Sequence, residues 1–353
     1  MSKINGTIWT FHRISPARDE AKIHFFDNNY NVYPDVLEYY IVRSLAQNYR
    51  FVSLADFLKN KQNKTGSEKD ICITIDDGGK DIYTYAYPIF KKYNIPFTFF
   101  VNVGFINEGF QSCNFPEFEA TQLFFDYINS KNTIELDSET VKTSTMKEKQ
   151  EAFFKLWDHY TQQRKLGIEP IKIIENITKE PIDFQEYHKK YACSWDDIIN
   201  MSKDDLCTIG SHGIHHNRLI DLNENDLEKE LKESRDYLSE KIKKPIDYIS
   251  YPYGLHNDLV VNVTKKYYKA ACAILVANSD RRYVKRSDNI YLLPRKTFIC
   301  AELLDLLLPH KKQKLKLPWL NNRFIKIFFK VRCKNNEVYY RICGIKVKAR
   351  TKI

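Results

Sequence analysis

The sequence predicts an α/β fold in which seven or so parallel strands close, or nearly close, into a distorted (β/α) barrel. Short β-branched runs alternate with segments of helical periodicity, and several runs are almost continuously apolar, as in strands buried on both faces. Polar residues also gather where these runs end, at His12, Asp76-Asp77, Asn102, Ser211-His212 and Tyr251-Pro252-Tyr253. Catalytic groups of (β/α) barrels occupy these carboxyl ends.

The first part of the chain contains a strand–helix–strand unit. Gly6 to Arg13 is predicted as the first strand, and Tyr33 to Asn48 as a helix, because its apolar residues recur with helical period. Ile71 to Ile75 and Phe97 to Val103 are predicted as buried strands, with a helix from Tyr83 to Tyr93 between them. A unit of this length and order pairs its two strands in parallel.

The same rhythm returns in the last part of the barrel. The predicted strands are Leu206 to Gly210, Asp247 to Tyr251, Ala270 to Val276 and Ile290 to Phe298, and the predicted helices are Asn223 to Lys243 and Asp258 to Lys269. Together with the first part, this gives the strand number expected for a barrel.

Residues 105 to 194 interrupt the rhythm. Helices are predicted there at Glu117 to Lys131, Met146 to Arg164 and Pro170 to Ile177, and the segment is too long for a simple loop. We therefore expect a barrel domain over residues 1–308, with a helical insertion at about 105–194 that covers the barrel mouth, and a small basic module over 309–353.

The net charge of +10 belongs to the C-terminal module. Residues 311–353 contain 14 Lys or Arg and one acid, Glu337, a net charge of +13, so the rest of the chain sums to −3. Bulky apolar residues such as Trp319, Phe324, Phe328 and Tyr339 interleave with these charges. This mixture suits peripheral binding to an anionic membrane surface; a packed basic appendage is the alternative, and nucleic acid is not expected as a partner.

Cysteine usage and hydropathy indicate the cellular setting. The eight cysteines are scattered without a CxxC pair, which is typical of reduced core thiols rather than of a disulfide or zinc framework. The first 16 residues lack the pattern of a signal peptide, and no run approaches 18 apolar residues. We expect a cytoplasmic protein that binds, at most, to the inner face of the cell membrane.

Two short motifs indicate the chemistry. Asp76-Asp77-Gly78-Gly79 ends a buried strand, and His212 and His216 lie four residues apart. One carboxylate and two imidazoles suit a catalytic divalent metal with open positions, and the second carboxylate is then available as a general base. Taken alone, the first motif could be a turn or helix cap and the second a surface pair. Together they predict a metal-dependent hydrolase rather than an iron oxygenase, because the two-histidine, one-carboxylate sites of those oxygenases lie on an all-β jelly roll and this sequence shows no all-β pattern.

These motifs resemble those of the polysaccharide deacetylases of the NodB-homology class, carbohydrate esterase family 4. Thr74-Ile75-Asp76-Asp77-Gly78 is similar to the family's T-F-D-D-G. His212-Gly213-Ile214-His215-His216 resembles H-[ST]-x-x-H, and Ser250-Tyr251-Pro252-Tyr253-Gly254 resembles R-x-P-[FY]-G. Phe11-His12-Arg13-Ile14 looks like the opening strand of a subgroup from bacterial surface-glycan gene clusters. The resemblance covers residues 5 to about 300 and implies a NodB-type barrel.

The resemblance also implies roles for individual residues. Asp77, His212 and His216 would hold the divalent metal, most simply Zn²⁺, and Asp76 would take a proton from the attacking water. The backbone N–H of Tyr253, presented by a turn at Pro252, would face the developing oxyanion. Pro252, Asn102 and His256 are predicted to contact the substrate.

The chain departs from the family pattern at two positions. Ser250 stands where an arginine commonly tethers the catalytic base, and Leu293-Pro294-Arg295 replaces the L-x-H motif, whose histidine acts as general acid. We therefore expect Arg295 to reach Asp76 and act in catalysis, and His12 or His256 to protonate the leaving amine.

The predicted function is removal of an N-acetyl, or O-acetyl, group from a sugar during bacterial surface polysaccharide or lipopolysaccharide assembly. Two alternatives stay open at this point: deformylation of a lipid-linked aminosugar, and a catalytically weak glycan-binding scaffold. The intact metal and base residues favour an enzyme, whereas the missing L-x-H histidine favours a scaffold.

Overall fold

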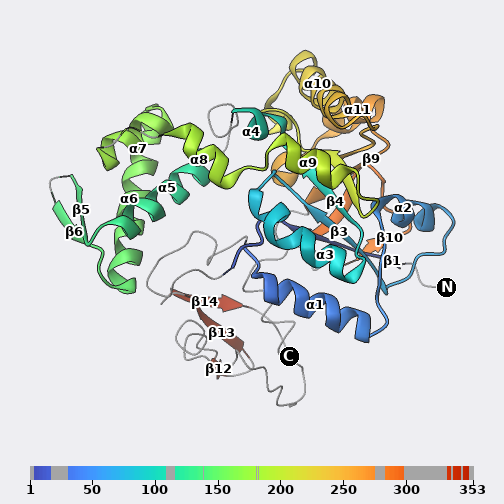
Figure 1. The fold of residues 1–353 in the computed structure, drawn as a ribbon, viewed down its shortest axis with the longest axis horizontal. Helices are drawn as coiled ribbons and strands as arrows, with labels where there is room; N and C mark the ends of the chain where they lie inside the picture. Colours follow the sequence, from blue (N-terminus) through green and yellow to red (C-terminus); the bar gives the residue numbers. More distant parts are fainter. Residues whose placement is uncertain are drawn as a thin grey trace. The chain divides into compact units, whose positions relative to one another are not determined.

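The computed structural model describes residues 4–16, 31–108, 116–137, 139–179, 181, 183–274, 283–297, 332–334, 337–342 and 345–349 (Figure 1). Contacts divide the chain into two units, residues 1–304 and 305–353.

A closed parallel barrel forms the centre of the first unit. Among the described residues, seven strands pair in the order β1-β11-β9-β8-β7-β4-β3, and the pairing of β3 with β1 closes the ring. The strands are β1 (Ile4–Phe11), β3 (Asp70–Ile75), β4 (Phe97–Val101), β7 (Cys207–Ser211), β8 (Tyr248–Ser250), β9 (Ala270–Ile274) and β11 (Leu293–Thr297). The predicted fold class is confirmed, and every predicted strand of the ring is present, most of them shorter than expected.

Burial of both strand faces explains the continuous apolar runs. All six residues of β3 and all five of β4 are buried, since one face packs inside the barrel and the other against helices. Two short strands extend the sheet: β2 (Arg50–Phe51) pairs in parallel with β3, and β10 (Val284–Lys285) pairs antiparallel with β1. The thiols of Cys72 and Cys272 are buried and free, as expected for reduced core cysteines.

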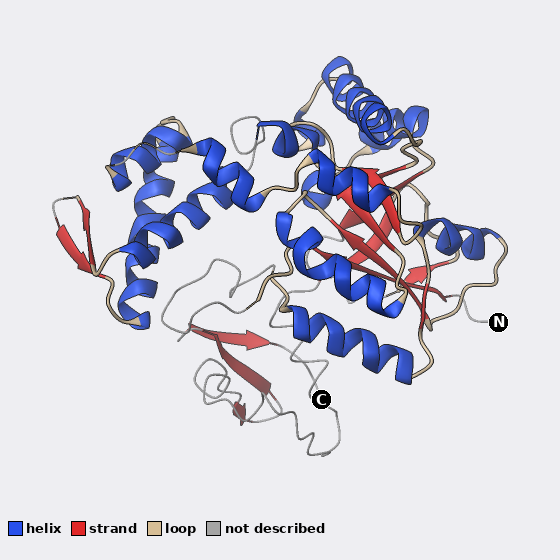
Figure 2. Cartoon of the chain, in the orientation of Figure 1, coloured by secondary structure: helices blue, strands red, loops and turns tan. Residues whose placement is uncertain are grey.

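Helices surround the barrel strands (Figure 2). They are α1 (Pro34–Ala46), α2 (Leu54–Gln62), α3 (Tyr87–Tyr93), α4 (Val103–Glu108), α9 (Trp195–Ser202), α10 (Glu224–Ile242) and α11 (Asp258–Tyr267). The segment predicted as one helix from Tyr83 to Tyr93 begins instead with a π-helical turn at Ile82–Ala86. A π-turn of this kind often lies near a functional site, and this one follows the Asp76-Asp77 motif directly.

The insertion has a hydrophobic core of its own. Its helices are α5 (Pro116–Ser130), α6 (Met146–Lys165), α7 (Pro170–Thr178) and α8 (Phe184–Tyr191), drawn in green in Figure 1. Phe124, Phe125, Leu156 and Ile174 are among the buried residues that pack together there. A hairpin of β5 (Thr133–Leu136) and β6 (Glu139–Lys142) joins α5 to α6 and was not predicted. That the insertion covers the barrel mouth stays a prediction.

The described part of the second unit is a small antiparallel sheet. β13 (Glu337–Ile342) pairs with both β12 (Arg332–Lys334) and β14 (Ile345–Ala349). Trp319, Phe324 and Phe328, on which the membrane prediction depends, lie outside the described residues. Within the described residues, none of the helices has both the length and the apolar character needed to span a bilayer.

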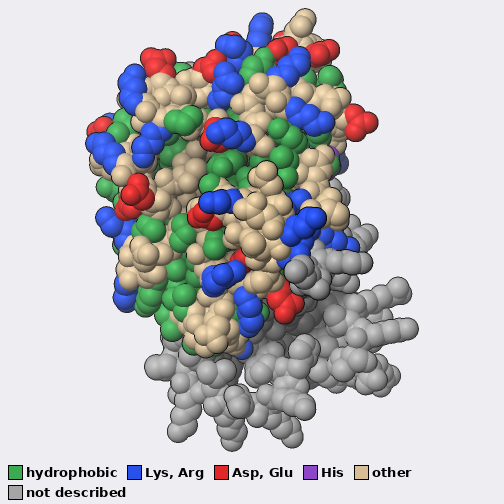
Figure 3. Space-filling view, turned by 90° about the vertical axis from the view of Figure 1, so that its right-hand side faces the viewer, with side chains coloured by type: hydrophobic (Ala, Val, Ile, Leu, Met, Phe, Trp, Pro, Cys, Tyr) green, Lys and Arg blue, Asp and Glu red, His purple; other side chains and the backbone are tan. Residues whose placement is uncertain are grey.

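Charges of both signs are mixed on one face of the first unit. On the face seen in Figure 3, Lys and Arg side chains alternate with Asp and Glu and with apolar groups. This mixed surface agrees with the small net charge of the chain outside residues 311–353.

Candidate active site

The Asp76-Asp77 pair lies at the carboxyl end of β3, where the backbone turns sharply. Asp76 still follows the sheet, since its N–H donates to the Phe11 carbonyl at 3.0 Å. Asp77 has a φ of 81° and Gly78 a φ of 131°, so the two carboxylates are aimed differently. A Cβ on Gly78 would lie 2.8 Å from a methyl carbon of Ile106. The turn therefore begins at Asp77, which itself adopts the left-handed conformation, and continues through Gly78.

Residues 212–216, which we call the His loop, follow β7 directly. The Nδ1–H of His212 donates to the Ser250 carbonyl at 2.8 Å, so its Nε2 is the nitrogen that faces Asp77. Gly213 and His216 both have positive φ, 78° and 54°. These turns bring His216 back beside His212, with ring centroids 4.9 Å apart.

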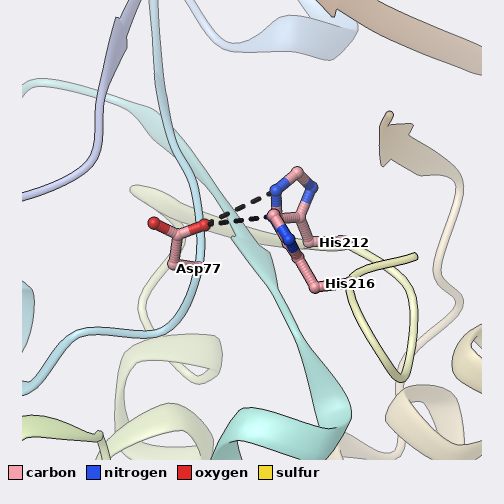
Figure 4. Close-up of side chains that lie close together, drawn as sticks. All are labelled: Asp77, His212 and His216. Atoms are coloured by element: carbon pink, nitrogen blue, oxygen red, sulfur yellow. Dashed lines mark ion pairs between the residues drawn. The ribbon is translucent and has the colours of Figure 1, made fainter. Parts of the chain in front are cut away.

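Asp77, His212 and His216 converge on one point (Figure 4). The Asp77 Oδ1 atom lies 3.5 Å from His212 Nε2 and 3.9 Å from His216 Nε2. Ligands of a tetrahedral zinc site at ~2.1 Å from the ion lie about 3.4 Å apart, close to these spacings. The three side chains thus fit a divalent cation.

The electrostatics of these three side chains favour a cation as well. Asp77 Oδ1 is buried and accepts no hydrogen bond from the described residues. Burial, reinforced by the charge of Asp76, raises the pKa of Asp77 to about 8. Burial also lowers the pKa of both His212 and His216, which keeps their rings neutral, as metal ligands require. A positive charge between them would relieve the cost of ionising Asp77.

Arg295 binds Asp76 through two parallel hydrogen bonds. Its Nη1 and Nη2 atoms donate to Asp76 Oδ1 and Oδ2, each at 2.7 Å. Nη2 also donates to Ser250 Oγ at 2.7 Å, and Ser250 donates in turn to Asp76 Oδ2 at 3.1 Å. Burial alone would raise the pKa of Asp76, but Arg295, with His212 and His12, lowers it well below its usual range. Arg295 on β11 thus holds Asp76 in place, the role that the family pattern gives to an arginine at the position of Ser250.

His12 and Tyr253 lie beside these groups. His12 Nε2 is 4.0 Å from Asp76 Oδ2, and burial lowers the pKa of His12 to about 4. The ring of Tyr253 packs edge-on against His216 with centroids 4.6 Å apart and stays 43% exposed. Tyr253 has a φ of 58° and follows the buried Pro252, so its peptide is held in an unusual turn.

Asn102 and His256, both predicted to contact the substrate, lie in different surroundings. Asn102 is fully buried, and its Nδ2 donates to the His212 carbonyl at 3.1 Å while its Oδ1 accepts from the Phe105 N–H at 2.9 Å. This arrangement favours a role in positioning the His loop over the predicted substrate contact. His256 is exposed and its Nδ1–H donates to the Gly254 carbonyl at 3.2 Å, so its contact with the substrate stays a prediction.

Sequence reasoning missed Asp81, which anchors the loop after Asp77. Asp81 Oδ2 accepts from the Ile14 N–H at 2.5 Å, and Asp81 Oδ1 forms an ion pair with Arg13 Nε at 2.8 Å. Both charged side chains are buried. The only sequence signal was a third carboxylate four residues after Asp77, which by itself indicates nothing more than a helix start.

The family profile described as polysaccharide deacetylase matches residues 63–270. A poly-β-1,6-N-acetyl-D-glucosamine N-deacetylase of Staphylococcus aureus is 26% identical over 291 residues, which cover 81% of this chain and 76% of that protein. Its namesake from Staphylococcus epidermidis is 33% identical over 73 residues, 21% of this chain and 25% of that protein.

Two solved structures share the fold. The Streptococcus pyogenes deacetylase PplD in complex with acetate has a TM-score of 0.54 at 17% identity, covering 86% of this chain and 98% of its own. IcaB from Ammonifex degensii has a TM-score of 0.52 at 15% identity, covering 86% and 95%. With the profile match spanning more than half of the sequence, the chain belongs to the polysaccharide deacetylase family, enzymes that hydrolyse N-acetyl amide bonds on sugars.

Proposed function

We propose that this chain is a metal-dependent deacetylase that removes N-acetyl groups from an N-acetylglucosamine polymer of a bacterial surface. The observation that carries the proposal is the Asp76 carboxylate, held by Arg295, beside the convergent Asp77, His212 and His216. The substrate class rests on the staphylococcal relatives, which are named for deacetylating poly-β-1,6-N-acetyl-D-glucosamine.

Asp77, His212 and His216 would hold the cation, with Zn²⁺ favoured by the two nitrogen donors and one oxygen donor. When bound, such a cation supplies Lewis acidity and lowers the pKa of water towards ~7. Asp76 is ionised at neutral pH, because the paired Arg295 stabilises its charge, and it accepts the proton of the attacking water. The backbone N–H of Tyr253, in its turn after Pro252, faces the developing oxyanion.

The leaving amine needs a proton, and Asp76 is the group we infer to return it. With its pKa lowered to about 4, His12 is neutral at pH 7 and therefore a poor imidazolium acid. Once protonated, Asp76 is a strong acid, since Arg295 favours its ionised form. His12 Nε2 lies 4.0 Å from Asp76 Oδ2, beyond hydrogen-bond distance, so we assign the proton to Asp76 rather than to His12 as predicted from the sequence.

Acetate release tests the proposal. Purified protein, loaded with Zn²⁺ and then stripped by a chelator, should release acetate from N-acetylglucosamine oligomers only in the loaded form. Parallel substrates carrying O-acetyl groups, or an N-formyl group on a lipid-linked aminosugar, distinguish the other acyl chemistries. Binding of the oligomers without any acyl release would favour the scaffold alternative.

The ion pair between Arg295 and Asp76 should stabilise the folded protein. Arg295→Met would leave Asp76 as a buried carboxylate without its cation, so we expect unfolding to become easier by about 3–5 kcal/mol. Urea denaturation measures this difference. The matched control, Arg218→Gln, removes an exposed pair with Asp221 and should cost no more than about 1 kcal/mol. Equal stabilities of the two variants would contradict the assigned pairing.

The C-terminal module carries a second proposal, peripheral binding to an anionic membrane surface that presents the glycan. Its net charge of +13 attracts anionic lipid, and salt weakens the attraction because the Debye length shrinks from ~10 Å at 0.1 M to ~3 Å at 1 M. We expect the intact chain to sediment with phosphatidylserine-containing vesicles at low salt and to be released at high salt. A chain that ends at His310 should stay in the supernatant throughout. If both chains were divided in the same way between vesicles and supernatant, the module would not bind the membrane and would be a packed appendage.

A further inference from the structure

Three successive backbone N–H groups of the His loop are bound by side-chain oxygens from outside it. The Gly213 N–H donates to Ser211 Oγ at 3.1 Å. The N–H groups of Ile214 and His215 both donate to Glu230 Oε1, at 2.7 and 2.8 Å. Consecutive N–H groups that point to one side form a concave site for an anion, and here a carboxylate of the same chain fills it.

Glu230 directs both of its oxygens at the His loop. It lies on α10, and its side chain is only 3% exposed. While Oε1 accepts the two backbone bonds, Oε2 lies 2.8 Å from Nδ1 of His215. A buried carboxylate with three such partners is a strong anchor, because hydrogen bonds to a charged acceptor are about twice as strong as neutral ones.

Gly213 is the residue that makes room for this carboxylate. Its φ is 78°, and a Cβ there would lie 2.8 Å from Glu230 Oε1. A serine or threonine, as in the H-[ST]-x-x-H motif, would both strain the backbone and push the carboxylate away. The glycine at position 213, where the motif has serine or threonine, is therefore what allows the Glu230 carboxylate to bind the His loop.

The opposite side of the His loop is held through its carbonyl groups. Asn102 Nδ2 donates to the His212 carbonyl at 3.1 Å, and the N–H groups of Val103 and Gly104 donate to two further loop carbonyls at 3.0 and 2.9 Å. The segment after β4 thus binds the carbonyl side of the loop and Glu230 binds the N–H side. Between them, these contacts fix the backbone that carries both imidazoles.

We propose that Glu230 is a positioning residue that sets the geometry of His212 and His216 for a divalent cation. The proposal rests on the proposed function, because it takes those two residues as ligands. It goes beyond that function in assigning an effect on metal affinity to a carboxylate on α10, which binds the backbone of Ile214 and His215 and the side chain of His215.

The test measures Zn²⁺ affinity of the whole chain by competition with a chromophoric chelator. Glu230→Ala should weaken Zn²⁺ binding by roughly 10–100-fold, the usual effect of losing a group that orients metal ligands. Glu230→Gln should weaken Zn²⁺ binding less, because its amide oxygen can still accept hydrogen bonds from the backbone N–H groups of Ile214 and His215. The matched control is Glu233→Gln, one turn along the same helix and exposed, which should bind Zn²⁺ like the unaltered chain.

A second readout separates positioning from general stability. The rise in melting temperature on adding Zn²⁺ should shrink in Glu230→Ala, whereas a residue that is merely structural would lower the melting temperatures of the metal-free and metal-loaded forms alike. If Glu230→Ala does not fold, Gly213→Ala decides, since its Cβ displaces the same carboxylate and should weaken Zn²⁺ binding too.

The inference would be overturned, and the proposed function left standing, if folded Glu230→Ala bound Zn²⁺ with unaltered affinity. Where that variant does not fold, unaltered Zn²⁺ affinity in Gly213→Ala would have the same meaning. Failure of the unaltered chain to bind Zn²⁺ is a different result, which would overturn the proposed function and this inference with it.

Discussion

Asp76→Asn should lower the rate of acetate release by roughly 10²-fold or more while the protein keeps its metal. The amide is nearly the same shape as the carboxylate but cannot take a proton from water. It also leaves Arg295 without a negative partner, although Ser250 Oγ still accepts one of its hydrogen bonds. The measurement is acetate released per bound metal ion, so that loss of folded protein is not counted as loss of chemistry.

An exposed aspartate serves as the control for this variant. Asp205→Asn changes the same charge on the surface of the first unit and should leave the rate unchanged. A full rate in Asp76→Asn would remove Asp76 from the mechanism and reopen the scaffold alternative.

His212→Ala should abolish stoichiometric metal binding. The variant removes one of three side chains around the cation, so its Zn²⁺ affinity should fall by more than the roughly 10–100-fold typical of losing an outer-shell partner. Metal content after gel filtration, measured by mass spectrometry, gives the result. His159→Ala, in the insertion helix α6, should keep full metal content. Full occupancy in His212→Ala would show that the ligand assignment is wrong.

The barrel could be predicted from the sequence because its strands and helices differ in period. Continuous apolar runs such as those of β3 and β4 have no other stable location than a sheet covered on both sides. Helix α9 was missed although Ser194 and Asp197 form a capping box there, a local signal that the sequence contains. The β5–β6 hairpin has strands of four residues, too short for alternation to be distinctive.

The site was predictable only in part, for a different reason. Asp77, His212 and His216 lie in recognisable motifs, so their convergence could be expected. The bond between Glu230 and the His loop depends on which face of α10 packs against that loop, and periodicity cannot give this. Asn102 was correctly predicted to follow a strand. Its amide bonds the backbone rather than facing the substrate, because both of its polar atoms are buried and need hydrogen-bond partners.

The position of Arg295 on the last barrel strand has a consequence for the order in which the enzyme is completed. Arg295 and Asp76 are 219 residues apart in the chain, and β11 joins β9 to β1 as the segment that completes the ring. During synthesis, Asp76 and the three side chains of the metal site emerge well before residue 295. Until β11 docks, Asp76 lacks the guanidinium that holds both of its oxygens in place. We therefore expect the orientation of the base to be set only when the barrel closes, so a chain that lacks β11 would carry its three metal-site side chains without a fixed base.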